Sequence, residues 1–242
     1  MNTLIPIIIS SIAGLSTIIG NILIFIPVKY KNQVLSFSFG LSSIVMLLIS
    51  IFELIPEGLN LIKNTYQIHT IMIQSLILLL IGYYIIKIVD KKLEHQENLY
   101  RVGILSMISI LIHNIPEGII CAITSSINIK IGLKVSLAIL IHNIPEGICI
   151  SLPIYYSTKS KLKAFIYTLI SGAGEVIGAI ITILFLKSYI TANLLYFVYL
   201  ITAGIMITLS LTKLLKQGLE LHNYYSFILG IVLGIIIIII TI

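Results

Sequence analysis

Long apolar stretches follow one another along this chain, and a short polar segment separates each stretch from the next. The stretches are about 20 residues long, which is the length that an α-helix needs to cross the hydrocarbon core of a bilayer. The period-2 alternation of apolar and polar residues that marks membrane β-strands is absent. The pattern therefore predicts an all-α integral membrane protein with eight transmembrane helices, at residues 4–26, 34–59, 68–89, 102–126, 131–155, 163–187, 191–213 and 223–242.

The eight spans and their short connections account for the chain, so we expect a single polytopic membrane domain over residues 1–242. Composition agrees, because 58% of the residues are apolar and 10% are charged, whereas a soluble domain carries about 25% charged residues. The first apolar stretch lacks the basic segment and cleavage site of a signal peptide and is expected to be a retained helix. A multi-pass protein of the cell membrane, surrounded by the lipid bilayer, is the predicted class.

The distribution of the positive charges along the chain indicates how the spans are oriented in the membrane. The formal net charge of +6 could suggest a nucleic-acid partner, but eleven of the fifteen Lys and Arg residues lie in or beside alternate connections, namely Lys29, Lys31, Lys87, Lys91, Lys92, Arg101, Lys159, Lys161, Lys163, Lys213 and Lys216. The other four are Lys63, Lys130, Lys134 and Lys187. Cytoplasmic connections carry the excess of Lys and Arg. The bias predicts that both termini are extracytoplasmic and that nucleic acid is not a partner.

One eight-residue string, Ile-His-Asn-Ile-Pro-Glu-Gly-Ile, occurs twice, at 112–119 and 141–148, in two successive predicted spans. A charged side chain at the bilayer centre costs about 2.5–3.5 kcal/mol on insertion scales, so such groups usually mark a pathway or an ion site. Helical residues three and four apart share a face, and the short connection makes the two spans antiparallel neighbours. The polar faces of the two spans are expected to meet near mid-membrane. They would bring together the side chains of His113, Asn114, Glu117, His142, Asn143 and Glu146.

Imidazole and carboxylate groups are ligands of divalent transition metals such as zinc, iron and manganese. Two carboxylates between two imidazoles can bridge a pair of ions, and the weakly binding amide oxygen of Asn suits an ion that must leave again. Pro116 and Pro145 lack an N–H group and predict kinks whose freed carbonyls face a cavity or an ion. A hydrogen-bonded network that only fixes helix packing would explain one copy of the string, but it does not require the same His, Asn and Glu side chains twice.

Three further carboxylates extend the candidate set. Glu175 lies in a glycine-rich part of the sixth span without a basic partner there, and we expect it to be a ligand of a second ion. Glu53 and Glu57 lie near the predicted outer surface, where the Pro-Glu-Gly pattern occurs again without His and Asn. They predict an entrance that concentrates cations. An equally favoured alternative is that they are two solvated carboxylates at a helix end. Cys121 and Cys149 are the two cysteines. They are expected to pack as small apolar side chains, and the alternative is that a thiol borders the ion path.

At these motifs the chain resembles the ZIP (Zrt/Irt-like) family of zinc and iron permeases, and most closely its short bacterial branch. The His-Asn-x-Pro-Glu-Gly string in two successive spans and the Ser-Gly-x-x-Glu-x-x-Gly stretch of the sixth span carry the resemblance, which extends over all eight spans. The resemblance implies uptake of Zn²⁺ into the cytoplasm, with Fe²⁺, Mn²⁺ and Cd²⁺ as further cargo and no cofactor. It also suggests a homodimer, and a motion of spans 1, 4, 5 and 6 as a unit against spans 2, 3, 7 and 8.

The resemblance further implies a binuclear centre. One ion would be held by His113, Glu117, His142 and Glu146. The second ion would be held by Asn114, Asn143 and Glu175 together with Glu117 and Glu146, which bridge the two ions.

Two departures from the family pattern affect these expectations. The family commonly has a proline after the glutamate of the sixth span, and Val176 in its place predicts a straighter helix. Lys213 and Lys216 stand at the end of the seventh span, where many members have an acidic residue and a proline. Cations there would repel a departing metal ion unless their side chains extend into the cytoplasmic interface.

Two other functions remain as alternatives. An intramembrane dinuclear metalloenzyme would fit a buried His/carboxylate site, but di-iron bundles use Glu-x-x-His and metalloproteases use His-Glu-x-x-His, whereas this chain has His-x-x-x-Glu. We therefore expect that the protein is not an enzyme. A proton-coupled transporter could use His113 and His142 as proton relays without binding a metal, and it would show no metal-dependent thermal shift.

Overall fold

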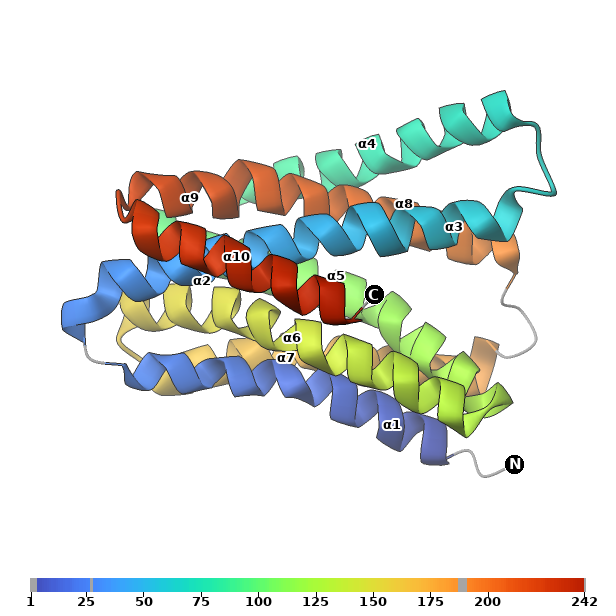
Figure 1. The fold of residues 1–242 in the computed structure, drawn as a ribbon, viewed down its shortest axis with the longest axis horizontal. Coiled ribbons are helices and arrows are strands. Elements are labelled where there is room, and N and C mark those ends of the chain that lie inside the picture. Colours follow the sequence, from blue (N-terminus) through green and yellow to red (C-terminus); the bar gives the residue numbers. More distant parts are fainter. Residues whose placement is uncertain (1–3, 27, 187–190, 242) are drawn as a thin grey trace.

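The computed structural model describes residues 4–26, 28–186 and 191–241, which form a bundle of helices that run roughly along one common axis (Figure 1). These residues contain no β-strand, as the apolar pattern predicts. The α-helices are α1 (Leu4–Leu15), α2 (Lys31–Ile49), α3 (Ile55–Ile62), α4 (Ile68–Lys92), α5 (Asn98–Ile127), α6 (Ile129–Thr158), α7 (Lys161–Ile181), α8 (Ala192–Leu209), α9 (Leu215–Glu220) and α10 (Tyr224–Thr241). The remaining helical turns are the 3₁₀ segments Ser16–Phe25 and Val28–Tyr30 and the π segments Ser50–Leu54, Thr182–Leu186 and Ser210–Leu214.

These helices join into eight spans, because α1 continues as a 3₁₀ helix and π segments join α2 to α3 and α8 to α9. Within the described residues, seven segments are long and apolar enough to cross a membrane, and Tyr224–Ile240 is a shorter apolar eighth. The predicted number and order of helices are confirmed. The seventh span, expected to end at residue 213, continues to Glu220, since the π segment extends it without a break.

Four sequence predictions are not decided by the fold. The predicted ends of the sixth and the last span, at residues 187 and 242, lie outside the described residues. The extracytoplasmic location of both termini and the single domain over residues 1–242 stay predictions.

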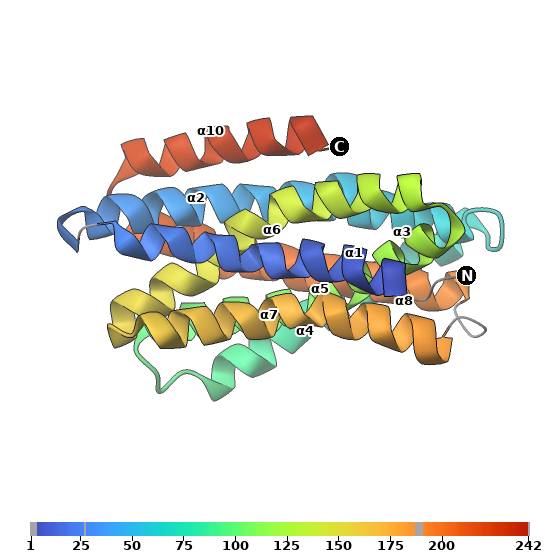
Figure 2. The same ribbon diagram turned by 90° about the horizontal axis from the view of Figure 1, so that it is seen from below.

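The helices pack in two groups. The first group contains α1 with its 3₁₀ continuation, α5, α6 and α7, and the second contains α2, α3, α4, α8, α9 and α10. Helix α10 lies along the outside of α2 (Figure 2). The groups meet mainly where α2 packs on α6 and α5 packs on α8. This division coincides with the two sets of spans that the family resemblance implies, while their relative motion stays a proposal.

Glycines set the close approach of α5 and α7. Gly178 on α7 lies against the backbone of Ile115, and Gly118 on α5 lies against the backbone of Glu175, so a Cβ atom at either glycine would overlap main-chain atoms. Small residues at helix contacts are typical of membrane proteins, in which packing replaces the hydrophobic effect. Gly174 and Gly178 form one Gly-x-x-x-Gly pair on α7, and a second such pair, Gly230 and Gly234, packs α10 against α2 in the same way. Both pairs therefore serve contacts within the chain.

An ion cluster ties three helical segments together at one end of the bundle. Asp90, near the end of α4, has its Oδ1 atom 2.5 Å from Nη2 of Arg101 on α5 and its Oδ2 atom 2.5 Å from Nζ of Lys213. Asp90 is 8% exposed. Lys213 is thus neutralised by a carboxylate, so the repulsion of a departing ion that the sequence suggested does not come from an unpaired charge. This end also carries the lysine-rich connections and is the predicted cytoplasmic end.

Replacing Asp90 by asparagine is expected to lower the free energy of unfolding by about 1–3 kcal/mol, the range for removing one partner of charged hydrogen bonds. The variant leaves Arg101 and Lys213 facing each other without the carboxylate between them. Glu220→Gln is the matched control, because Glu220 forms an exposed pair with Lys216 at 3.9 Å, and such pairs contribute little. Thermal unfolding of the purified protein measures both variants, and equal melting temperatures would contradict a stabilising role of the cluster.

Candidate metal centre

The duplicated strings lie side by side on α5 and α6, and Glu175 on α7 lies beside them. The seven candidate ligand residues have at most 5% of their surface exposed, namely His113, Asn114, Glu117, His142, Asn143, Glu146 and Glu175. Pro116 and Pro145 lie inside helices that continue past them, and the predicted kinks stay predictions. Helix α7 runs through Val176 without an internal proline. The three helices therefore bring the predicted residues into one buried region.

Each motif histidine bonds the glutamate of the other helix. His113 Nε2 lies 3.1 Å from Glu146 Oε2, and His142 Nε2 lies 3.2 Å from Glu117 Oε1. The sequence places the histidine and glutamate of one copy on the same helix face, and the structure joins them crosswise between α5 and α6. Such hydrogen bonds are electrostatically stronger in a buried, low-dielectric region than in water.

The two carboxamides are held by their nitrogen atoms. Asn114 Nδ2 donates to the carbonyl oxygen of Ser171 on α7, at 3.1 Å. Asn143 Nδ2 donates to the carbonyl oxygen of Ala13 on α1, at 3.1 Å, and also to Oε1 of Glu175. These bonds fix the orientation of each amide, and each Oδ1 atom is left without a hydrogen-bond partner.

Buried polar atoms without a hydrogen-bond partner gather at the candidate ligands. Six of the eleven such side-chain atoms in the described residues belong to this set, namely His113 Nδ1, Asn114 Oδ1, Glu117 Oε2, Asn143 Oδ1, Glu146 Oε1 and Glu175 Oε2. Glu146 Oε1 still lies 3.1 Å from His113 Nε2, within ion-pair distance. Roughly nine in ten buried polar groups in proteins are paired, so a cluster of exceptions requires an explanation such as an ion. Five of the six atoms are amide or carboxylate oxygens, which are ligand atoms for divalent cations.

No group of three or more His, Cys, Asp or Glu side chains in the described part of the chain is arranged to hold a metal ion. The crosswise pairs give the reason, because each motif imidazole directs Nε2 at a carboxylate instead of at a shared point. A cation that bound both histidines and both glutamates would have to replace the two His–Glu hydrogen bonds with metal–ligand bonds. Such an exchange suits an ion that binds and leaves, since conduction requires a site that releases what it binds.

Glu53 and Glu57 have different surroundings. Glu53 lies in the π segment Ser50–Leu54, close enough to His142 and Glu117 to interact with them electrostatically. Glu57, one turn further along, is exposed. Glu53 is thus a carboxylate of the second helix group within electrostatic range of the candidate centre, and it lies in a π turn of the kind that is frequent at functional sites. An entrance formed by both residues stays a prediction.

Two serines that the sequence analysis did not single out bind the backbone of the motifs. Ser42 on α2 donates to the carbonyl oxygen of Pro145, at 2.6 Å, and Ser10 on α1 donates to that of Gly118, at 3.3 Å. Both serines are fully buried. Their partners are far away in the chain, so the local sequence carries no signal that separates them from other serines in apolar helices.

Comparison with known proteins agrees with this arrangement. The profile of a family described as "ZIP Zinc transporter" matches residues 91–241, which include both motifs and Glu175. The chain is 33% identical to "Zinc transporter ZupT" of Enterobacter sp. (strain 638), over 95% of this chain and 93% of that protein. It is 31% identical to "Zinc transporter ZupT" of Salmonella heidelberg (strain SL476), over 96% of this chain and 93% of that protein.

A third relative, "Zinc transporter ZupT" of Escherichia fergusonii, is 31% identical over 95% of this chain and 93% of its own length. These relatives are transporters and not enzymes, which confirms the prediction against catalysis. Together with the apolar helices, they identify a multi-pass plasma-membrane protein that transports divalent metal, without an implied cofactor. The chain belongs to the ZIP family of zinc transporters.

Proposed function

We propose that this chain takes up Zn²⁺ into the cytoplasm through a binuclear centre on α5, α6 and α7. One ion binds His113, Glu117, His142 and Glu146. The second ion binds Asn114, Asn143 and Glu175 together with the same two glutamates, which bridge the pair. Nitrogen and oxygen ligands in one shell suit Zn²⁺ but discriminate modestly among first-row metals, so Fe²⁺, Mn²⁺ and Cd²⁺ are further cargo.

The cluster of unpartnered buried oxygen atoms carries this proposal. Leaving a buried acceptor without a partner costs about 1–3 kcal/mol per group, and packing alone gives no compensation for several such groups in one place. Divalent cations would provide partners for the oxygen atoms of Asn114, Asn143 and Glu175 at once. They would also offset the charge of the carboxylates, which are almost completely buried.

The helix packing supports a mobile carrier. All seven candidate ligands lie on α5, α6 and α7, which belong to the first helix group, and the second group contributes Glu53 beside them. The ligands would therefore keep their mutual geometry if the first group slid against the second. Access to the centre would then alternate between the two membrane faces while the ions stay bound.

Zinc uptake by the purified protein in lipid vesicles tests this function. Vesicles that contain the wild-type protein and a trapped Zn²⁺-sensitive dye are expected to fill much faster than protein-free vesicles when Zn²⁺ is added outside. Added Zn²⁺ should also raise the melting temperature, since a ligand that binds only the native state stabilises it. Folded protein that shows neither uptake nor a thermal shift would contradict metal transport and favour the proton relay through His113 and His142.

Two ions per chain are expected at saturation, and Glu175→Gln is expected to bind one. The amide cannot supply the negative charge that the second ion uses, while the first ion keeps its imidazoles and carboxylates. Equilibrium titration with Zn²⁺ measures the stoichiometry, and uptake should slow by about tenfold, at the low end of the 10–100-fold range for changes around metal sites. Glu94→Gln is the control, because Glu94 is exposed in the turn between α4 and α5, outside the centre and the predicted entrance. Two ions in the Glu175 variant would exclude Glu175 as a ligand.

The homodimer stays an expectation from the family resemblance. Both Gly-x-x-x-Gly pairs, which could have supported contacts between chains, pack within the chain.

A further inference from the structure

A polar cavity of about 360 Å³ lies at the predicted cytoplasmic end of the bundle, between the start of α2 and the connection from α9 to α10. Both segments lie at the same end of the bundle (Figure 1 and Figure 2). The described residues that line the cavity are Lys29, Lys31, Asn32, Gln33, Leu221 and Asn223. The cavity therefore joins two parts of the chain that are far apart in the sequence.

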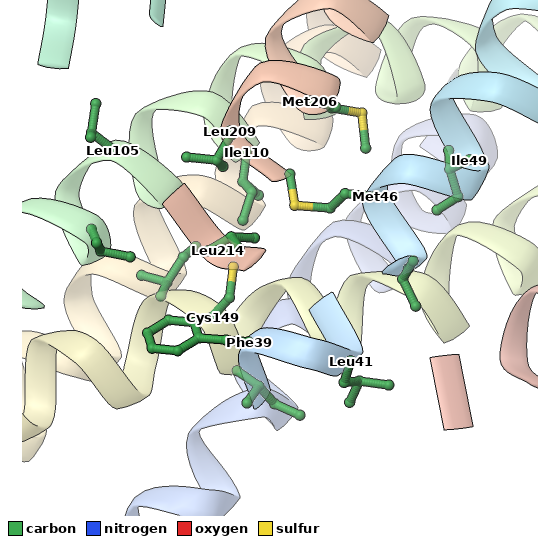
Figure 3. Close-up of a cluster of buried hydrophobic side chains, with 14 of the residues drawn as sticks. Phe39, Leu41, Met46, Ile49, Leu105, Ile110, Cys149, Met206, Leu209 and Leu214 are labelled. Atoms are coloured by element: carbon green, nitrogen blue, oxygen red, sulfur yellow. The ribbon is translucent and has the colours of Figure 1, made fainter. Parts of the chain in front are cut away.

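A hydrogen bond and apolar packing hold the walls of this cavity in place. Ser36 on α2 is fully buried and donates to the carbonyl oxygen of Asn223, at 3.0 Å. Further along α2, Figure 3 shows Phe39 and Leu41 in a cluster of buried hydrophobic side chains. The bundle interior next to the cavity is therefore apolar, and a charged ligand in the cavity would stay at this end of the bundle.

The charge of the cavity distinguishes it from two other polar cavities at the same end. Each of those contains a carboxylate beside its lysine, because Lys216 lines one together with Glu220 and Lys163 lines the other together with Glu97. The described lining of the cavity beside α2 contains two lysines and no carboxylate. None of the ion pairs among the described residues involves these two lysines. This cavity is thus suited to an anion.

Aromatic rings position the positive charges. Lys29 Nζ lies 4.8 Å from the centre of the Tyr30 ring, and Lys31 Nζ lies 5.6 Å from the centre of the Tyr156 ring on α6. Lys159, at the end of α6, has its Nζ atom at the same distance from the Tyr156 ring. Such contacts attract cations to the faces of aromatic rings. A third lysine therefore adds to the positive potential beside the cavity.

We propose that this cavity binds the phosphate headgroup of an anionic phospholipid. Basic pockets between transmembrane helices on the cytoplasmic side suit such headgroups, because the cytoplasmic leaflet is rich in anionic lipids. Lys29 and Lys31 bind the phosphate oxygen atoms. A lipid fits better than a free phosphate ion, since the wall of the cavity continues into α10, where Tyr225 and Ile228 are 79% and 58% exposed and can contact acyl chains. The inference goes beyond metal transport and does not depend on it.

Thermal unfolding tests this site on the full chain in phosphatidylcholine-containing micelles. Added phosphatidylglycerol is expected to raise the melting temperature up to a limit, because a ligand of the native state stabilises it. Lys29→Gln/Lys31→Gln should need at least about fivefold more phosphatidylglycerol for half of the rise, the factor expected for one lysine near anionic lipid. Lys163→Gln/Lys216→Gln is the control, since it removes the same charge from the two cavities that contain carboxylates. This control and Lys29→Arg/Lys31→Arg should behave as the wild type.

The proposal would be overturned if phosphatidylglycerol did not stabilise the wild-type protein. Equal losses in both glutamine double variants would also overturn it, because the effect would then reflect the general surface charge. Inorganic phosphate should give no rise, and a rise equal to that with phosphatidylglycerol would exclude a lipid site. If Lys29→Gln/Lys31→Gln does not fold, Lys29→Gln at its exposed position provides the comparison, and an unchanged lipid requirement would contradict the proposal. These measurements record lipid binding and not uptake, so failure of this site is distinguishable from failure of zinc transport.

Discussion

Replacement of either motif glutamate by alanine, Glu117→Ala or Glu146→Ala, is expected to reduce Zn²⁺ uptake at least about 100-fold while the protein stays folded. Each carboxylate bridges both ions in the proposed centre, so one substitution removes a charged ligand from two sites. Changes to residues that only support metal ligands already reduce affinity or activity by about 10–100-fold. Uptake into dye-loaded vesicles at equal protein content measures the loss.

The protein should stay folded in these variants, because each substitution removes a carboxylate and leaves only a histidine without its partner. Without Glu146, the His113 imidazole loses one hydrogen-bond partner. Without His113, by contrast, the fully buried Glu146 carboxyl group loses its imidazole partner, and an unpaired buried carboxylate costs more than an unpaired neutral group. His113→Ala is therefore expected to melt at a lower temperature than Glu146→Ala, although alanine removes a side chain in both.

The exposed Glu94 supplies the control for uptake, since Glu94→Ala removes a carboxylate from the turn between α4 and α5, outside both the proposed centre and the predicted entrance. This variant should retain most of the wild-type rate. Wild-type uptake by Glu117→Ala and Glu146→Ala would show that the proposed centre is wrong. The reverse order of melting temperatures would contradict the crosswise pairing of His113 with Glu146.

The sequence predicts the helices well because lipid imposes a strong and local requirement on each span. A backbone in hydrocarbon must satisfy its own hydrogen bonds, so a long apolar stretch has few alternatives to a helix. The end of the seventh span was missed because Lys213 and Lys216 suggested an aqueous boundary. In the structure Lys213 is paired with Asp90 and the helix continues to Glu220. The pairing partner lies on another helix, so the charge pattern near Lys213 could not reveal it.

The residues of the candidate site are predictable from the sequence, but the contacts between them are not. Two identical polar strings in apolar spans indicate a functional site, because each copy carries the cost of burying polar side chains in the membrane. The sequence could not tell that His142 bonds Glu117 across the helix pair, nor that Glu53 approaches both. These contacts depend on the rotation and depth of packed helices. Periodicity indicates which residues share a face, and tertiary packing decides which faces meet.

Gly118→Ala is expected to destabilise the protein by about 2 kcal/mol or more and to impair uptake. The added Cβ atom would overlap the backbone of Glu175 on α7, and overpacking of this kind costs about 1–3 kcal/mol even where side chains can adjust. Alanine has the better helix propensity, but that gain of about 1 kcal/mol offsets only part of the cost. Because α7 must move away from α5, Glu175 would also shift relative to Asn143, which it bonds. Thermal unfolding and vesicle uptake measure the two effects.

Gly103→Ala on the same helix separates this steric effect from the general effect of replacing a glycine. A Cβ atom at Gly103 would overlap Cδ1 and Cγ1 of the Ile154 side chain and would lie 3.3 Å from the Ile154 backbone nitrogen. Because most of this overlap is with a side chain, the Gly103 variant should be destabilised less than the Gly118 variant. If both variants unfolded at the wild-type temperature, the close contact between α5 and α7 would not be what holds Glu175 in place. If both were equally destabilised, the loss would reflect replacement of glycine in α5 and not the backbone of Glu175. The expected difference between the two variants thus links one helix contact to the geometry of the proposed metal centre.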